Sequence, residues 1–188
     1  KNPEKSLAAY TENYHLGLWV TGKKVSNSWA HADEESPVYE LKAYVENIFL
    51  RLGLNMRNLV VGNLVDDIYA TALSVQTKGG KRLATFGIVT KKILKAFDID
   101  NEVYYADLNW KELMKAIRSV KISYTEISKF PAVKRDLALL IDKKVQFAEI
   151  EKIAYETEKK LLKEVSLFDV YEGKNLEAGK KSYAVSFL

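Results

Sequence analysis

Residues 164–171 read Glu-Val-Ser-Leu-Phe-Asp-Val-Tyr, and residues 181–188 read Lys-Ser-Tyr-Ala-Val-Ser-Phe-Leu. Both stretches are rich in β-branched and aromatic residues, and the second alternates between apolar and small polar side chains. The segment between them contains glycine and lysine. The two stretches therefore predict a β-hairpin with a long loop at the end of the chain.

The residues before this hairpin predict one more strand and one helix. Lys134 to Ile141 has the composition of a strand, and a spacing of three or four residues marks one face of a helix that has no obvious N-cap. That face comprises Phe147, Ile150, Ala154, Thr157 and Leu161. The order is β-α-β-β, whereas a ferredoxin-like domain runs β-α-β-β-α-β, so we expect a ferredoxin-like domain that stops two elements early.

The hairpin is expected to have one covered face and one open face. Because successive side chains of a strand point to opposite faces, its apolar residues can lie under the helix while its polar residues stay open. The apolar set is Phe168, Val170, Tyr183, Val185 and Phe187. The open set is Asp169, Tyr171, Ser182 and Ser186.

The open set suits an unstacked nucleic-acid base. Stacking of a base on an aromatic ring contributes about 1–3 kcal/mol, and polar groups can read the base edges. Three lysines in or beside the loop suit phosphates, namely Lys174, Lys180 and Lys181. A net charge of +4 mildly favours a polyanionic partner. The alternative is an ordinary half-solvated sheet beside a lysine-rich loop.

Upstream residues predict an α+β domain with a mainly antiparallel sheet. Ser36 suits a helix N-cap and Pro37 the first helical position. The core-facing residues of that helix are Val38, Leu41, Val45, Ile48 and Leu52. Strands are expected over 14–20, 59–61, 69–75, 82–89 and 102–108, and short helices over 91–97 and 110–117. Because periodicity fades between 118 and 129, we expect one domain over 1–120 and another over 121–188.

Several kinds of chemistry lack the residues that they need. The chain has no cysteine and only two histidines, His15 and His31, which are too few for a typical zinc site. Acidic clusters at 33–35 and 66–67 are expected to cap and solvate rather than to hold a metal. Neither histidine matches a serine or cysteine nucleophile, so we expect no catalytic residue. No apolar run of about 18 residues occurs, which predicts no membrane segment. The absence of cysteine is consistent with a cytoplasmic location.

Three ordered motifs in the last third are similar to the anticodon-binding domain that ends the β subunit of bacterial phenylalanyl-tRNA synthetase. They occupy residues 130–142, 167–174 and 179–182. The resemblance implies that Tyr171 stacks on the first anticodon base and that Asp169 and Ser182 form hydrogen bonds nearby. It also implies that Ala154 approaches the anticodon, although the helical spacing of Ala154 predicts a core position.

The first two-thirds of the chain resembles the preceding part of the same β subunit, a degenerate copy of the class II synthetase catalytic domain. The matching positions are Trp29, Asp33, Leu41-Lys42, Val45-Glu46 and Leu52-Gly-Leu54. Ala43 replaces a common glycine, and residues 79–82 match the Gly-Arg-Ser segment of the family only loosely.

This resemblance implies a non-catalytic role for the chain. The copy in that family is inert and packs against the α subunit of an α2β2 assembly, which holds ATP, phenylalanine and the active site. The chain would then need no cofactor of its own. It would contribute tRNA(Phe) binding and subunit assembly to a ligase that uses ATP and magnesium.

Two other interpretations remain open at this point. The first is a ferredoxin-like sensor of a small molecule, such as an amino-acid-binding regulatory module, for which amino-acid-dependent dimerisation would be evidence. The second is an independent enzyme, which lacks a catalytic constellation in the sequence.

Overall fold

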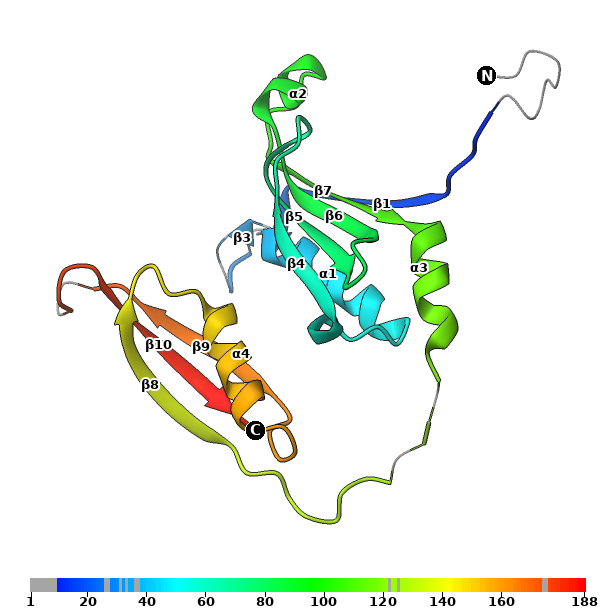
Figure 1. Ribbon diagram of the computed structural model, residues 1–188. Helices are drawn as coiled ribbons and strands as arrows, with labels where there is room; N and C mark the ends of the chain where they lie inside the picture. Colours follow the sequence, from blue (N-terminus) through cyan, green and yellow to red (C-terminus); the bar gives the residue numbers. More distant parts are fainter. Residues whose placement is uncertain are drawn as a thin grey trace. The chain divides into compact units, whose positions relative to one another are not determined.

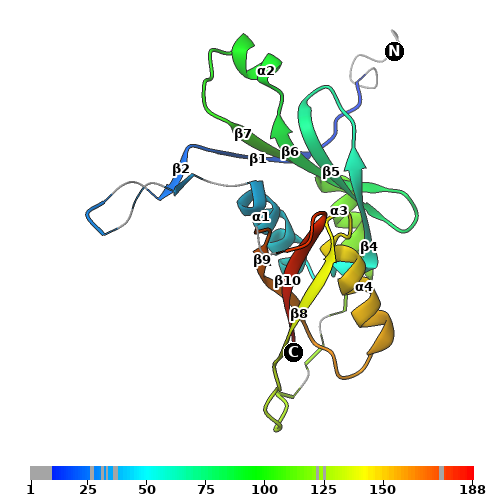
Figure 2. The same ribbon diagram turned by 90° about the vertical axis from the view of Figure 1, so that its left-hand side faces the viewer.

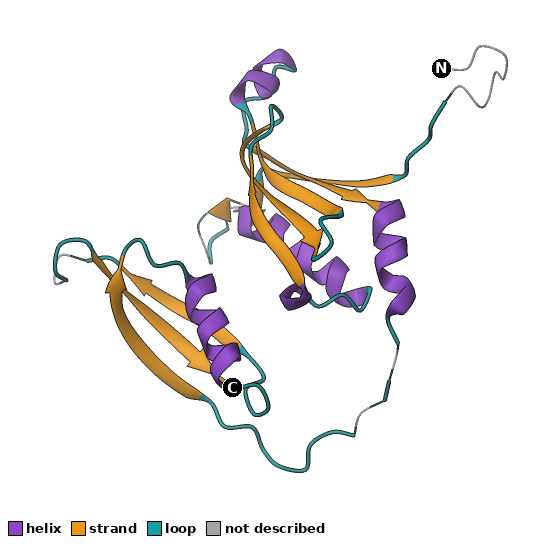
Figure 3. Ribbon diagram, in the orientation of Figure 1, coloured by secondary structure: helices purple, strands orange, loops and turns teal. Residues whose placement is uncertain are grey.

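A computed structural model describes residues 10–25, 28–30, 32, 34–35, 38–121, 123–124, 126–173 and 176–188. The chain divides into two compact units, Lys1–Ser123 and Tyr124–Leu188. Both units are built of antiparallel strands with few helices, so the predicted α+β class is confirmed (Figure 3). The domain boundary that we expect after residue 120 stays a prediction.

The first unit contains a five-stranded antiparallel sheet with the strand order β1-β7-β6-β5-β4 (Figure 1). Its strands are β1 (His15–Thr21), β4 (Leu59–Leu64), β5 (Tyr69–Thr77), β6 (Arg82–Val89) and β7 (Val103–Asn109). The hairpin between β5 and β6 turns at Gly80, whose φ of 77° suits glycine because it has no Cβ. All five strands predicted from the sequence of this unit are present.

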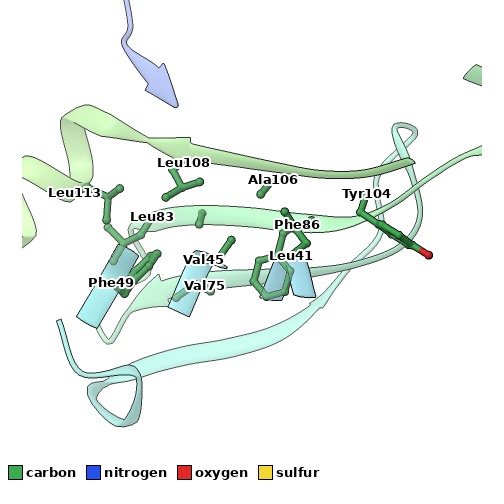
Figure 4. Packing of buried hydrophobic residues seen from close by; sticks show 11 residues of the cluster. Leu41, Val45, Phe49, Val75, Leu83, Phe86, Tyr104, Ala106, Leu108 and Leu113 are labelled. Atoms are coloured by element: carbon green, nitrogen blue, oxygen red, sulfur yellow. The ribbon is translucent and has the colours of Figure 1, made fainter. Parts of the chain in front are cut away.

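One face of this sheet is covered by α1 (Val38–Arg51). Leu41, Val45 and Phe49 lie on one stripe of the helix and are fully buried against the sheet (Figure 4). The helix ends at Arg51, and Gly53, two residues later, turns the chain with a φ of 75°. The predicted N-cap Ser36 and the predicted first helical residue Pro37 lie outside the described residues.

Smaller elements complete the first unit. The predicted short helices are α2 (Lys91–Ala96) and α3 (Trp110–Ala116), and the latter is capped by Asn109, whose Oδ1 accepts a hydrogen bond from the Glu112 N–H at 3.1 Å. Elements not predicted are β2 (Lys23–Val25), β3 (Glu34–Glu35) and two single-turn 3-10 helices, η1 (Met56–Asn58) and η2 (Ile117–Ser119).

The second unit has the predicted order β-α-β-β. Its elements are β8 (Arg135–Asp142), α4 (Phe147–Thr157), β9 (Val165–Tyr171) and β10 (Lys180–Phe187). The strands form an antiparallel sheet in the order β8-β10-β9, and α4 packs on one face of it (Figure 2). Val165, Tyr183 and Val185 are the buried centre of that contact.

The hairpin departs from strict alternation at one point. The pairing of β9 with β10 shifts between Ala184 and Val185, which leaves one extra residue on β9. Because such a bulge reverses which side chains face the helix, Leu167 packs on the core while Phe168 keeps 57% of its surface exposed. The prediction that Phe168 lies under the helix is therefore wrong.

Both ends of α4 also differ from the prediction. At its start the Gln146 N–H donates to the Glu149 carboxylate at 2.9 Å, a cap that the sequence pattern did not reveal. At its end the Glu158 carboxylate accepts hydrogen bonds from the N–H groups of Lys160 and Leu161, which turns the chain away from the helix. Leu161 is consequently 77% exposed instead of lying on the core face of a longer helix.

Candidate nucleic-acid interface

The strand register of the second unit brings three predicted residues together. β10 is the central strand, and on it Ser182 pairs directly with Tyr171 while Ala184 pairs with Asp169. Directly paired residues point to the same face of a sheet. The side chains of Asp169, Tyr171 and Ser182 therefore share one face, opposite the face that Tyr183 and Val185 present to α4.

The same rows continue across β10 onto β8. Ser182 also pairs with Leu140, and Ala184 also pairs with Ala138. The small side chains of Ala138, Ser182 and Ala184 form the low centre of a strip on this face of the sheet. The larger side chains of Tyr171 and Leu140 stand at its two sides. Tyr171 is 44% exposed and Leu140 is 55% exposed. Such a strip offers an aromatic ring and apolar surface for stacking, with a carboxylate and a hydroxyl beside them.

The position of the Tyr171 ring depends on Gly173. A Cβ added to Gly173 would overlap the Tyr171 hydroxyl and the ring carbon that carries it. The ring therefore lies directly across the backbone of Gly173, and any other residue at 173 would require the Tyr171 side chain to shift. The sequence contains this signal as Tyr-Glu-Gly at 171–173, but the contact was not predicted.

Two ion pairs tie together the loops at this end of the sheet. Lys143 Nζ lies 2.9 Å from Glu172 Oε2, and Lys180 Nζ lies 2.9 Å from Asp142 Oδ1. The hydrogen bond from Lys143 holds the pKa of Glu172 below its usual value. The hydrogen bond to Asp142 raises the pKa of Lys180. Because these groups are solvated, the pairs are expected to place the loops rather than to add much stability.

The three lysines predicted to contact phosphates occupy different environments. Lys174 lies outside the described residues. Lys180 is paired with Asp142, as above. Lys181 is only 7% exposed, and its ammonium donates a hydrogen bond to Tyr183 Oη at 2.7 Å. Since neighbouring residues of a strand face opposite sides, Lys181 lies on the side of α4 rather than beside Ser182. The geometry thus does not favour a phosphate contact at Lys181.

Two further predicted residues lie apart from the strip. Ala154 on α4 packs against the buried cluster, so the sheet separates it from the open face. Ser186 is on the row of Ser182 but is 3% exposed, and its hydroxyl donates to Asp136 Oδ1 at 2.6 Å. Neither side chain is presented to a ligand on the strip in this conformation.

Sequence reasoning also missed Phe168, the extra residue of the bulge. Its ring is exposed, and the ammonium of Lys134 lies 5.8 Å from the ring centroid. The apolar character of Phe168 predicted a core position, because a bulge leaves no mark in the period-2 pattern of the sequence.

Among the described residues, no group of three or more metal-ligating side chains is arranged to hold an ion. The predicted acidic cluster at 33–35 is only partly described, since Asp33 falls outside the described residues, as does His31. In the same described part of the chain, no helix is long and apolar enough to cross a membrane.

A helix-covered antiparallel sheet in the order β-α-β-β places the second unit in the ferredoxin-like class, and the strip on its open face is a candidate nucleic-acid interface. The family model described as "Ferredoxin-fold anticodon binding domain" matches residues 128–188. A second model, "Phenylalanyl tRNA synthetase beta chain CLM domain", matches residues 2–110, more than half of the chain. The chain therefore belongs to the phenylalanyl-tRNA synthetase beta chain family, as its motifs predicted.

Known relatives agree over the whole chain. It is 88% identical to the phenylalanine–tRNA ligase beta subunit of Bacteroides fragilis over 188 residues, and 87% identical to that of Bacteroides thetaiotaomicron. Identity to the corresponding subunit of Porphyromonas gingivalis is 51% over 187 residues. In each case all of this chain is covered but only 23% of the relative, so the chain spans about a quarter of the length of these proteins.

Proposed function

We propose that this chain contributes tRNA binding and subunit assembly to a phenylalanine–tRNA ligase. The supporting observations are the two family matches and relatives that are named as the beta subunit of that ligase. The ligase joins phenylalanine to tRNA(Phe) in the cytoplasm, with ATP and magnesium as its cofactors. Catalysis belongs to the α subunit of an α2β2 assembly, and this chain supplies no catalytic residue.

Within this function, the strip on the open face of the β9–β10 hairpin binds the first anticodon base. The Tyr171 ring stacks on the base, while Asp169 accepts a hydrogen bond from its edge and Ser182 forms another. The observation that carries this proposal is the strand register, which pairs Ser182 with Tyr171 and sets Asp169 one row away on the same uncovered face. Lys174 and Lys180 contact phosphates of the tRNA near that base.

Assembly with the α subunit uses the first unit. The outward side of α1 carries Tyr39, which is 74% exposed, and Leu50, which is 69% exposed. These two side chains are the part of α1 that would contact the α subunit.

The base-stacking role is tested in the complete β subunit assembled with its α partner. Tyr171→Ala is expected to weaken tRNA(Phe) binding by about 1–3 kcal/mol, because one base loses its aromatic neighbour. Tyr124→Ala is a matched control, since Tyr124 is 88% exposed in the same unit and lies outside the strip. Equal affinities of Tyr171→Ala and the control would refute the assignment.

The same assay distinguishes stacking from base reading. Asp169→Ala removes an acceptor but no stacking surface, so it is expected to reduce discrimination against tRNA with a changed first anticodon base. Aminoacylation rates are compared for native and anticodon-mutated tRNA. If the variant and the unmodified enzyme discriminate equally well, Asp169 does not read that base.

A further inference from the structure

The first unit contains a cavity of about 290 Å³ that the proposed function does not use. It opens on the face of the five-stranded sheet that lies away from α1. Thr85 pairs with Asp107, so both point to this face, whereas Ala84 and Leu108 point to α1. The polar side chains around the cavity come from β1, β5, β6, β7 and the turn before β5, and they include His15, Asp66, Tyr69, Arg82, Thr85 and Asp107, with Tyr105 and Asn109 beside them.

One buried polar atom in this cavity, the Tyr69 hydroxyl, lacks a hydrogen bond of ordinary geometry among the described residues. Tyr69 is 7% exposed, and the Thr85 side chain is close enough to interact with its hydroxyl. Burial raises the pKa of Tyr69 to about 12, and the nearby Thr85 side chain offsets this rise only in part. The side chain is therefore a neutral phenol at physiological pH. Because a buried hydroxyl without a well-formed hydrogen bond is costly, a ligand that bonded to Tyr69 Oη would gain stabilisation at this cavity wall.

Tyr69 and Tyr105 form one wall of the cavity, and Trp19, which does not line the cavity, supports Tyr105 by stacking on it. Trp19 stacks on Tyr105 with centroids 4.7 Å apart, and Tyr105 lies nearly parallel to Tyr69 with centroids 6.0 Å apart. Gly17 makes room for this arrangement, since a Cβ at that position would lie 2.5 Å from the indole of Trp19. The wall is apolar and is held in place by strands that are far apart in the sequence.

Charges of both signs surround the rings. Asp107 accepts a hydrogen bond from His15 Nδ1 at 2.8 Å, and Asp66 is oriented by the Ile68 N–H, which donates to its Oδ1 at 2.9 Å. The second oxygen of each carboxylate has no hydrogen bond from the residues that the structure describes. Arg82 forms no ion pair with any described residue. The cavity thus combines two carboxylates and a neutral phenol with an uncommitted guanidinium.

We propose that this cavity binds a free α-amino acid. Its ammonium group lies between Asp107 and Asp66 and donates a hydrogen bond to Tyr69 Oη, its carboxylate meets Arg82, and its side chain lies against the aromatic wall. A zwitterion matches the two signs of charge, and the Tyr69 hydroxyl gains a well-formed hydrogen bond. The volume is at the low end of small-molecule sites, which span about 300–1,000 Å³, and so favours a ligand of this size over a nucleotide.

The test uses the complete β subunit assembled with its α partner, titrated calorimetrically with each common L-amino acid except phenylalanine. At least one of these amino acids is expected to bind with a stoichiometry of one molecule per β subunit. The N-acetylated and the decarboxylated forms of that amino acid are expected to bind at least about tenfold more weakly, the loss that follows removal of a charge-assisted hydrogen bond. Absence of binding by every amino acid would overturn the proposal.

Variants assign the binding to this cavity. Asp107→Asn and Arg82→Gln should each weaken binding at least about tenfold, whereas Asp100→Asn, which removes an exposed carboxylate outside the cavity, should not. Tyr69→Phe keeps the ring and removes only the buried hydroxyl, so it should fold normally and bind several-fold more weakly. Unchanged affinity in Tyr69→Phe and Asp107→Asn, or an assembled structure with a protein side chain in the cavity, would refute the proposal.

Discussion

Gly173 shows how one missing side chain can place a functional group. The Tyr171 ring lies across the backbone of Gly173, where any Cβ would overlap it. A change at this position therefore acts on the proposed base-stacking ring without touching the ring itself.

Gly173→Ala is accordingly expected to weaken tRNA(Phe) binding by the assembled enzyme, but by less than the about 1–3 kcal/mol expected for Tyr171→Ala, because the ring is displaced rather than removed. Affinity is measured by filter binding or fluorescence titration. Gly62→Ala is the control, since nothing lies within 4 Å of a Cβ at that glycine. An affinity equal to that of the control would show that the contact with Gly173 does not position Tyr171.

The ion pair beside Tyr171 makes a prediction about pH. The hydrogen bond from Lys143 lowers the folded-state pKa of Glu172, so the pair is intact at neutral pH and is lost as the pH falls through that pKa. Lys143→Met should move the pKa of Glu172 back up toward its ordinary value, as followed by NMR titration of the side-chain carboxyl. Lys144→Met should leave it in place. A pKa that is the same in both variants would contradict the pairing.

At the scale of elements, α1 anchors the first unit through one stripe. Phe49 is fully buried, while the next residue, Leu50, is 69% exposed. Phe49→Ala should lower the free energy of unfolding by about 3–5 kcal/mol, because it opens a cavity in the core. Leu50→Ala should change it by about 0.5 kcal/mol or less. Urea unfolding of the two variants measures the difference, and similar losses would contradict the observed packing.

The hairpin shows what a pattern of alternation can and cannot predict. It correctly predicted both strands and the pairing of Asp169 and Tyr171 on one side, because side-chain direction along a strand is a local property. It failed at Phe168, where a bulge interrupts the ladder. Bulges arise from the fit between two strands, so neither strand alone encodes them.

At the scale of the whole molecule, charge is expected to govern the strength of tRNA binding. The chain carries +4, with 29 basic against 25 acidic residues, and phosphate contacts release counterions when tRNA binds. If Lys180 contacts a phosphate, Lys180→Gln should lower the slope of log affinity against log salt by about 1 without changing anticodon preference. The slope is measured for tRNA(Phe) and the assembled enzyme. An unchanged slope would mean that Lys180 forms the ion pair with Asp142 but contacts no phosphate.

The sequence alone determined the family, the α+β class, the order of the elements and the open-face set of Asp169, Tyr171 and Ser182. These follow from motif order, spacing and period, which are local along the chain. Only the tertiary structure decided that Lys181 is buried against Tyr183, that the Tyr171 ring lies over Gly173 and that the buried Tyr69 hydroxyl lines a cavity. Burial and register depend on strands that are distant in sequence, and the cavity around Tyr69 joins residues from 15 to 109.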